Sequence, residues 1–122
     1  MTQDPFRSVP DGGILIQLPS GVQIIRRMKH EWTPLVDTLK GEDLARHTDR
    51  VRGSKFLRNW TLAAYVQWVT QTVDELGWNQ DTPASEHTED LGQAIGFSNA
   101  KAMTKIRVEL SSRCVHAYPV ED

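Results

Sequence analysis

The feature that most constrains the fold of this chain is a long uncharged stretch that has the period of a helix. No charged residue occurs between Arg58 and Asp74. Apolar residues recur there at intervals of three and four, which places each row on one side of a helix. The first row is Leu62, Tyr65, Val66, Val69, Val73 and Leu76, and the second is Trp60, Ala64 and Trp68. The pattern predicts a helix over 56–76 that is apolar on two faces and forms the centre of the fold.

Two short runs rich in β-branched residues precede this helix and indicate a β-hairpin. Residues 14–18 and 22–25 form the runs, and Pro19-Ser20-Gly21 between them supplies turn residues. Because a two-stranded hairpin is marginal by itself, it must pack on helices or pair with a further strand. Residues 114–120 have the character of a short strand that could take this place. Residues 1–12 contain turn and breaker signals and predict an irregular N-terminal arm.

Shorter helices are predicted on both sides of the central one. Thr33-Pro34 is a favourable helix start, because threonine can cap and proline at the first helical position loses no needed N–H group. Further helices are expected over 42–51, 86–95 and 99–111. The predicted fold is α+β and mostly helical. It is a single domain over 1–122 in which an N-terminal β-hairpin is followed by four or five helices around 56–76 and by a short C-terminal strand.

The composition limits the class of protein. A chain of 122 residues fits one domain that can bury a core without disulfides or metal. Apolar residues make up 39% and charged residues 25%, which excludes a disordered chain and one embedded in a membrane. The single cysteine, Cys114, excludes an internal disulfide, and residues 1–10 lack the pattern of a secretory signal. A cytoplasmic protein without membrane contact is therefore expected.

Charge is segregated along the chain, although the formal net charge is only −2. Residues 26–58 contain nine Lys or Arg and five Asp or Glu, whereas residues 59–100 contain six acidic residues and no Lys or Arg. Residues 101–113 are basic again, with four cations against one acid. In the first basic segment, Arg46 and Arg50 are four apart and would share a helix face. Such a chain can present surfaces of opposite charge.

Residues 88–107, TEDLGQAIGFSNAKAMTKIR, combine two glycines with a set of apolar offsets. A small residue early in a helix lets a second helix cross closely, and a turn glycine permits left-handed backbone. Gly92 and Gly96 occupy these two places, and the apolar offsets fall on Leu91, Ile95, Phe97 and Ala102. In this pattern the segment resembles a helix-turn-helix. The resemblance implies a regulator of transcription whose second helix enters the major groove of DNA.

The resemblance also implies particular DNA contacts. Asn99 would pair with adenine, and Arg107 would pair with guanine or phosphate. The lysines of the second helix would reach the phosphates, as would the earlier basic segment. The DNA-binding residues so assigned are Ser98, Asn99, Lys101, Thr104, Lys105, Arg107, Arg46 and Arg50.

One offset of this segment departs from the family pattern. The last apolar position falls on the charged Lys105, and the periodicity of the second helix instead groups Met103, Ile106 and Leu110. That stripe would bury Met103, which the motif needs at the DNA surface. The segment can therefore also be interpreted as two helices that are joined by a glycine turn and packed on the core.

The stretch without cations favours a second hypothesis, in which the chain binds a basic protein. Its acidic residues would form an anionic surface, and Trp78 after the central helix is a candidate interface anchor. Anionic surfaces of this kind complement basic partners. The residues assigned to this surface are Asp74, Glu75, Trp78, Glu86, Glu89 and Asp90.

Other groupings do not complete a reactive site. Asp43 and His47 would share a helix face but lack a third metal ligand nearby. Cys114 and His116 alternate on the predicted C-terminal strand but lack a third residue to orient the histidine. No catalytic residue, metal or cofactor is therefore assigned. The sequence predicts a small non-enzymatic regulatory protein that either binds DNA through the helix-turn-helix-like segment or acts as a protein-binding inhibitor, antidote or accessory subunit.

Overall fold

The computed structural model describes residues 5–121, which separate into two compact units. Of these residues, unit 1 contains 5–27, 61–87 and 108–117, and unit 2 contains 28–60, 88–107 and 118–121. Each unit is thus built from three separate segments, and the prediction of one domain over 1–122 stays a prediction. In the predicted arm over 1–12, residues 1–4 lie outside the described chain, and Pro5–Ser8 form a 3-10 turn, η1.

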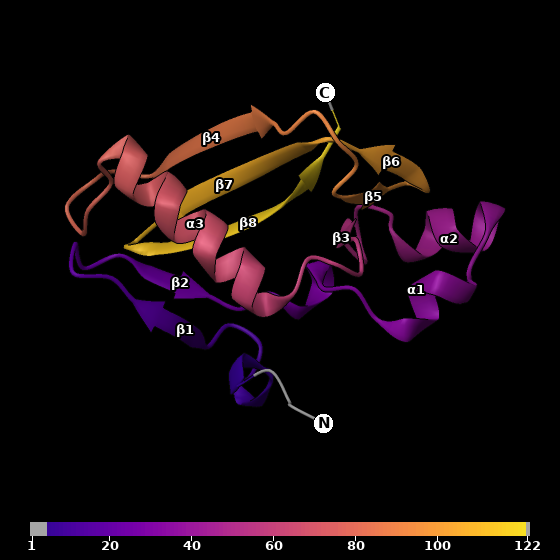
Figure 1. Cartoon of the computed structure of the whole chain (residues 1–122), viewed down its shortest axis with the longest axis horizontal. Coiled ribbons are helices and arrows are strands. Elements are labelled where there is room, and N and C mark those ends of the chain that lie inside the picture. The colour runs from indigo at the N-terminus through magenta and orange to yellow at the C-terminus, as the bar shows by residue number, and fades with distance from the viewer. Residues whose placement is uncertain (1–4, 122) are drawn as a thin grey trace. The chain divides into compact units, whose positions relative to one another are not determined.

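Within residues 5–121, the regular structure comprises three α-helices, eight strands and two 3-10 turns. Figure 1 labels the helices and strands. The helices are α1 (Pro34–Thr38), α2 (Gly41–His47) and α3 (Leu62–Leu76), and the second 3-10 turn is η2 (Met28–His30). A five-stranded sheet has the order β1 (Ile14–Gln17), β2 (Gln23–Ile25), β8 (Cys114–Val120), β7 (Lys105–Ser111) and β4 (Ser85–Asp90). A three-stranded sheet has the order β3 (Lys55–Phe56), β5 (Gly96–Ser98) and β6 (Lys101–Met103).

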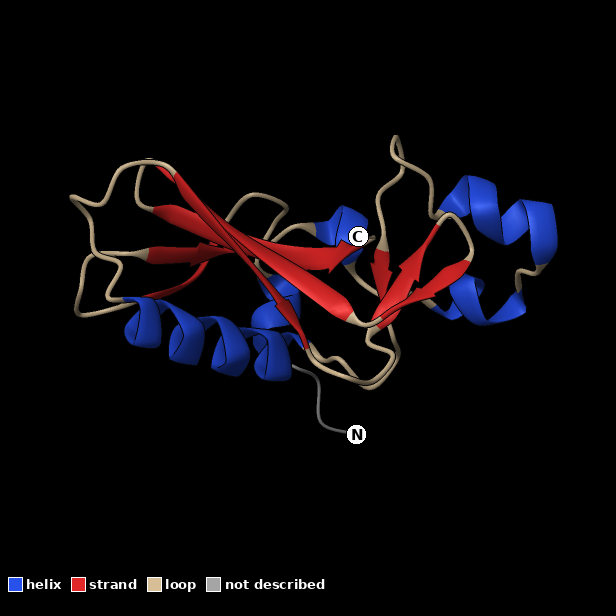
Figure 2. Cartoon of the chain, turned by 90° about the horizontal axis from the view of Figure 1, so that it is seen from above, coloured by secondary structure: helices blue, strands red, loops and turns tan. Residues whose placement is uncertain are grey.

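Unit 1 is built around α3, which lies along one face of the five-stranded sheet (Figure 2). The helix begins where the Thr61 hydroxyl accepts the N–H of Ala64 at 3.1 Å. Its buried face consists of Leu62, Tyr65, Val66, Val69, Thr72 and Val73. The hydroxyl of Tyr65 accepts the N–H of Ala117 in β8 at 3.0 Å and donates to the carbonyl of Ile25 in β2 at 3.4 Å. One side chain therefore ties the helix to two strands.

The long strands β7 and β8 alternate strictly between buried and half-exposed residues. The buried residues of β7 are Ile106, Val108 and Leu110, and those of the alternating part of β8 are Val115, Ala117 and Pro119. A tight turn joins the two strands, with Ser112 and Arg113 at φ values of 49° and 63°. Two successive residues with positive φ match the twist of a hairpin. The alternation buries one face of this hairpin.

The small sheet of unit 2 has a hairpin tip that is fixed on the end of α2. Asn99 and Ala100 form the β5–β6 turn, with φ values of 51° and 66°. The N–H of Asn99 donates to the carbonyl of Thr48 at 3.1 Å, and that of Ala100 donates to the Thr48 hydroxyl at 2.9 Å. This hydroxyl in turn donates to the carbonyl of Leu44 at 2.8 Å. A fully buried threonine thus satisfies backbone groups of both the helix end and the turn.

The interior of unit 2 also contains titratable side chains. The Nδ1–H group of the buried His30 donates to the carbonyl of Ser54 at 2.8 Å. The ammonium of Lys55, whose side chain is also buried, donates to the carbonyl of Arg52 at 2.8 Å and to that of Lys29. Burial lowers the pKa of Lys55, and the charge of Lys29 lowers it further. The buried ammonium group of Lys55 therefore donates its hydrogen bonds to backbone carbonyl oxygens instead of a carboxylate.

The prediction of a mostly helical fold is wrong, because the structure is a sheet-rich α+β fold. Most of β4 takes the place of the helix expected over 86–95, and β6 and β7 take the place of the one expected over 99–111, with β5 between them. The residues of β7 were predicted as a helix because a helical period was assigned to their apolar positions. Ile106, Val108 and Leu110 alternate with charged residues and have the period of a strand, whereas the helical interpretation left out Val108.

Strand β4 gave no such signal, because its sequence SEHTED contains no apolar residue. Its acidic residues suit the first turn of a helix, which led to the predicted helix. In the structure β4 is an edge strand beside β7, with alternating half-buried and exposed side chains. Pairing with a neighbour far along the chain therefore overrides the local preference.

Several local predictions are confirmed. Strands β1 and β2 form the expected antiparallel hairpin, and β8 pairs with β2 in parallel as the third strand beside it. Helix α1 begins at Pro34, although the hydroxyl of Thr33 makes no capping hydrogen bond. Two predicted helices exist but with shorter bounds. The central helix begins at Leu62 and not at residue 56, so Trp60 lies before it, and both Trp60 and Trp68 are half-buried. The helix expected over 42–51 runs from Gly41 to His47. No helix in the described part of the chain has the length and apolar character needed to cross a membrane.

Candidate functional site

The residues assigned to DNA all lie in unit 2, on strands, turns and a short helix. Ser98 and Asn99 end β5 and begin its turn, Lys101 begins β6, Thr104 follows β6, Lys105 and Arg107 lie in β7, Arg46 lies in α2, and Arg50 lies in the turn after it. Residues 99–107 form no helix, so they cannot present one to a DNA groove. The expectation of a helix-turn-helix that binds DNA and regulates transcription is therefore corrected. The described structure gives no support to an inhibitor role either.

The two glycines and the one arginine of residues 88–107 have structural roles that need no helix-turn-helix. Gly96 lies in β5, where a β-carbon would come within 2.4 Å of the carbonyl oxygen of Lys55. Gly92 has a φ of 74° in the turn after β4. The side chain of Arg107 donates to the Thr88 hydroxyl at 3.2 Å across two strands. Close packing and turn geometry therefore explain the two glycines without a helix-turn-helix.

The acidic residues assigned to a partner are divided between the units. Asp74, Glu75, Trp78 and Glu86 lie in unit 1, and Glu89 and Asp90 lie in unit 2. Asp90 accepts the N–H of Gly92 at 2.9 Å, and this bond is the main cause that lowers the pKa of the Asp90 carboxyl, followed by a bond from Thr104. Its carboxylate thus holds the local turn. The members in unit 1 are the better candidates for a contact with another molecule.

Four exposed carboxylates gather at one end of unit 1, and we call this group the acidic end. It consists of Asp74, Glu75, Asp81 and Glu86. In both Figure 1 and Figure 2, the C-terminus of α3, the loop after it and the start of β4 lie together at this end. Asp81 completes the group, although sequence reasoning counted it only as part of the acidic stretch.

Several hydrogen bonds hold the backbone that carries the acidic end. Gly77 ends α3 with a φ of 70°, and the N–H of Trp78 donates to the carbonyl of Val73 at 3.2 Å. In the loop, the N–H of Asp81 donates to the Asn79 side chain at 2.8 Å. One residue earlier in the loop, the N–H of Gln80 donates to the carbonyl of Ser20 in the β1–β2 turn at 3.1 Å. The four carboxylates are therefore presented from a pre-ordered backbone.

The negative charge of the acidic end is not compensated by ion pairs with described residues. Among the residues that the structure describes, none of its four carboxylates forms an ion pair, although Arg113 lies in the β7–β8 turn of the same unit. The described part of unit 1 contains four Lys or Arg against six Asp or Glu, whereas that of unit 2 contains ten against eight. By contrast, Asp43 in α2 pairs with Arg46 at 2.7 Å.

Comparisons with protein-family models, with curated proteins and with solved structures found no match. The case for the acidic end therefore rests on its own geometry.

Two apolar side chains lie at the acidic end. Trp78, which the sequence analysis assigned as a candidate interface anchor, is half-buried. Leu76 was missed, because it was placed on the buried stripe of the central helix but is 38% exposed. The signal was present, because a residue just before a helix-ending glycine has few neighbours on its own helix. An apolar pair among carboxylates has the composition of a protein interface, in which an apolar centre is surrounded by polar groups.

The cysteine and histidine of β8 do not form a nucleophilic pair. The Cys114 thiol donates to the side-chain oxygen of Gln23 at 3.7 Å, whereas His116 faces Glu109, with 3.6 Å between Nε2 and Oε2. In the described chain, no three His, Cys, Asp or Glu side chains are placed so that they could hold a metal ion. These groups are accordingly left out of the candidate site.

Proposed function

We propose that this protein is a non-enzymatic binding module that contacts a basic surface of another protein through the acidic end. The observation that carries the proposal is the group of four exposed carboxylates on a pre-ordered backbone without a cationic partner in the described chain. A partner that presents lysines or arginines would supply the missing charges. We place this contact in the cytoplasm, because a lone Cys114 suits a reducing compartment.

The position of two of these carboxylates costs folding stability, which supports a role in binding. Asp74 and Glu75 lie in the last turn of α3, where the helix dipole disfavours negative charge, and the same turn has no basic residue. A cation of a partner would interact favourably with both carboxylates and with the helix end. Local arrangements that oppose stability are expected where function requires them.

The exposed Leu76 and the half-buried Trp78 give the proposed interface an apolar centre. Aromatic residues with water-excluding neighbours contribute most to protein interfaces. The charges would then set orientation and association rate, and the apolar pair would slow dissociation.

Charge reversal tests the proposal. The double variant Asp74→Lys, Glu75→Lys is compared with Glu42→Lys, Asp43→Lys, which reverses two adjacent acids in the first turn of α2. The probe is a synthetic peptide rich in lysine, arginine and leucine, and its binding is followed by backbone amide NMR shifts. We expect shifts at residues 74–86 in the wild type, their loss in the α3 variant and their retention in the α2 variant. Equal losses in both variants would show unspecific charge attraction and would contradict the proposal.

The same variants test whether binding and stability are opposed. Asp74→Lys, Glu75→Lys should raise the free energy of unfolding by roughly 0.5 kcal/mol, because lysine suits the C-terminal turn of a helix. Glu42→Lys, Asp43→Lys should lower it, since acids suit the first turn and Asp43 pairs with Arg46. Urea denaturation measures both. A loss of stability in the α3 variant would remove the argument from the helix dipole.

A further inference from the structure

A groove in unit 2 brings together residues from two distant parts of the chain. Its volume is about 390 Å³. Its lining consists of Lys101, Ala102, Met103, Thr104, Lys105, Val120 and Glu121. Three of these residues were assigned to DNA from the sequence, and the groove gives them a different common surface. This surface belongs to unit 2, whereas the acidic end belongs to unit 1.

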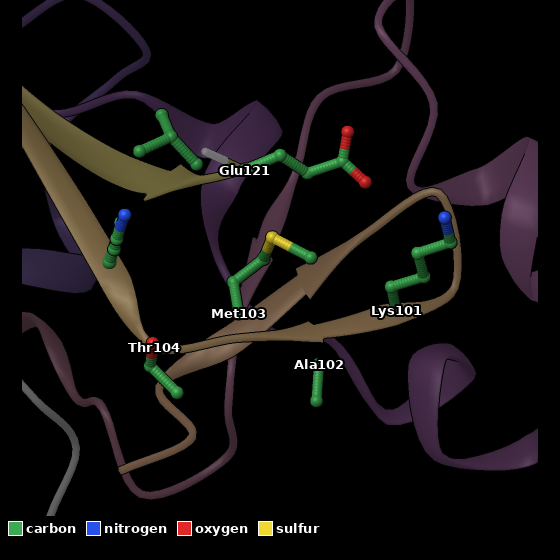
Figure 3. Close-up of a pocket in the computed structure, with 7 residues that line it drawn as sticks. Lys101, Ala102, Met103, Thr104 and Glu121 are labelled. Carbon is green, nitrogen blue, oxygen red and sulfur yellow. The ribbon is translucent and has the colours of Figure 1, made fainter. Parts of the chain in front are cut away.

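The alternation of β6 decides which side chains share a face. Successive side chains of a strand point to opposite sides. Figure 3 shows Lys101 and Met103 on one side of the strand, with Glu121 facing them from the end of β8, and Ala102 and Thr104 on the other side. Two side chains of β6 and that of Glu121, which follows β8, therefore surround one hollow.

The groove has an apolar floor and a charged rim. Met103 and Val120 are only 7% and 9% exposed, so a thioether and a branched side chain form the floor. Lys101 is exposed and forms no ion pair with a described residue. Lys105 brings a second ammonium group to the lining, although it also has interactions of its own. Glu121 adds a single carboxylate, so the charged lining groups are positive in sum.

We propose that this groove binds a small aromatic carboxylate. The ring lies over Met103 and Val120, because thioether sulfur packs favourably against aromatic rings. The carboxylate accepts hydrogen bonds from the ammonium group of Lys101 and is attracted by that of Lys105. Glu121 selects against a second negative charge on the ligand, since like charges repel at this distance scale. A hollow of this volume, with an apolar floor and few charged groups, has the character of a small-ligand site.

The methyl groups of the methionines allow ligand binding in the groove to be followed directly by NMR. The chain has three methionines, so ¹³C-methyl labelling gives few signals, of which Met103 reports on the groove and Met28 on an exposed site elsewhere in unit 2. The probes are benzoate, benzyl alcohol, benzylamine and acetate. We expect benzoate to shift the Met103 signal saturably and to leave Met28 unchanged. Benzyl alcohol and acetate should bind roughly tenfold more weakly, because each lacks one of the two interactions, and benzylamine should be the weakest.

A matched pair of variants tests the assigned cation. Lys101→Gln should weaken benzoate binding roughly tenfold, which corresponds to the loss of one charge-assisted hydrogen bond. Lys40→Gln removes an exposed lysine between α1 and α2 and should leave binding unchanged. Glu121→Gln should strengthen binding a few fold. The proposal is overturned if benzoate gives no saturable Met103 shift, if benzyl alcohol binds as tightly as benzoate, or if the two lysine variants behave alike.

Discussion

The two units of this protein stabilise their interiors in different ways. In unit 1, the buried side chains are mainly apolar, with Val69, Val73 and Leu110 almost or fully inaccessible, although Arg26 and Thr72 are buried too. In unit 2, Thr48 and Lys55 are buried as well, and both are bonded to backbone groups. The first arrangement depends on the hydrophobic effect and tolerates few cavities. The second depends on hydrogen bonds, so the loss of one partner leaves another polar group unsatisfied.

Two residues of similar burial can therefore affect the free energy of unfolding for different physical reasons. A buried apolar residue contributes in proportion to the contacts that it fills. A buried polar residue whose hydrogen bonds are all formed contributes little net free energy to folding. Its removal is still costly, because its former partners stay buried without a hydrogen bond. The following four predictions separate the two cases, beginning with the largest expected effect.

Leu110→Ala tests the apolar interior of unit 1. Leu110 is 2% exposed in β7, so its truncation should lower the free energy of unfolding by about 2–5 kcal/mol through lost contacts and a cavity. Leu76→Ala is the control, because this leucine is 38% exposed, and its cost should stay below about 1 kcal/mol. Urea denaturation of both variants gives the comparison. Equal costs would show that Leu110 does not belong to a packed core.

Thr48→Val tests the polar interior of unit 2. Valine keeps the shape of threonine but removes the acceptor of the Ala100 N–H group and the donor to Leu44. We expect a cost of about 1–3 kcal/mol, because a buried N–H group loses its partner. Amide hydrogen exchange at Ala100 should accelerate. Thr38→Val removes a similar local bond at an exposed site and should cost much less. If the two valine variants are equally stable, the bond from Ala100 does not hold the turn.

The β5–β6 turn of unit 2 and the β7–β8 turn of unit 1 both contain residues with positive φ, so they should respond alike to glycine substitution. Ala100 and Arg113 have φ values of 66° and 63°, which are unfavourable for residues with a β-carbon. Ala100→Gly and Arg113→Gly should each raise the free energy of unfolding by about 0.5–1 kcal/mol, since glycine relieves this strain. Ala63→Gly in α3 should have the opposite sign. Thermal unfolding would contradict the idea if glycine destabilised either turn.

The pH dependence of stability tests the buried ammonium group of Lys55. Burial, followed by the charge of Lys29, holds the pKa of Lys55 below 10.5 in the folded protein, and Asp49 opposes this in part. Between the folded pKa and 10.5, the unfolded state therefore binds more protons, so the stability contributed by this group increases with pH. The contribution is smallest below the folded pKa.

Lys55→Met should remove this increase. Urea denaturation at neutral pH and near pH 10.5 gives the stability difference between wild type and variant, which should grow in favour of the wild type as pH rises. Lys40→Met, at an exposed lysine, controls for general effects of charge. A difference independent of pH would mean that Lys55 titrates alike in the folded and unfolded protein.

Much of the local structure could be predicted from neighbouring residues. The hairpin over 14–25 follows from branched runs around Pro19-Ser20-Gly21, and the central helix follows from apolar residues at intervals of three and four. The start of α1 at Pro34 follows from the geometry of proline. Each of these signals lies within a few residues of the structure that it specifies, so no knowledge of distant segments was needed.

The strands of the second half depended on distant partners. The sequence 85–90 contains no apolar residue, and only its place beside β7 makes it a strand. The short strands β5 and β6 are set by a turn whose N–H groups are bound by Thr48, about fifty residues away along the chain. A helix satisfies most of its backbone groups internally, whereas a strand cannot, so its conformation depends on what lies beside it.

The candidate sites divide in the same way. The sequence by itself determined that Asp74, Glu75 and Glu86 lie in a stretch without cations, because charge is a property of each residue. The tertiary structure decided that Glu89 and Asp90 belong to the other unit, and that Lys101 and Met103 share a groove with Glu121. The physical reason is that a binding surface is set by the contacts between distant segments, and local periodicity carries no record of those contacts.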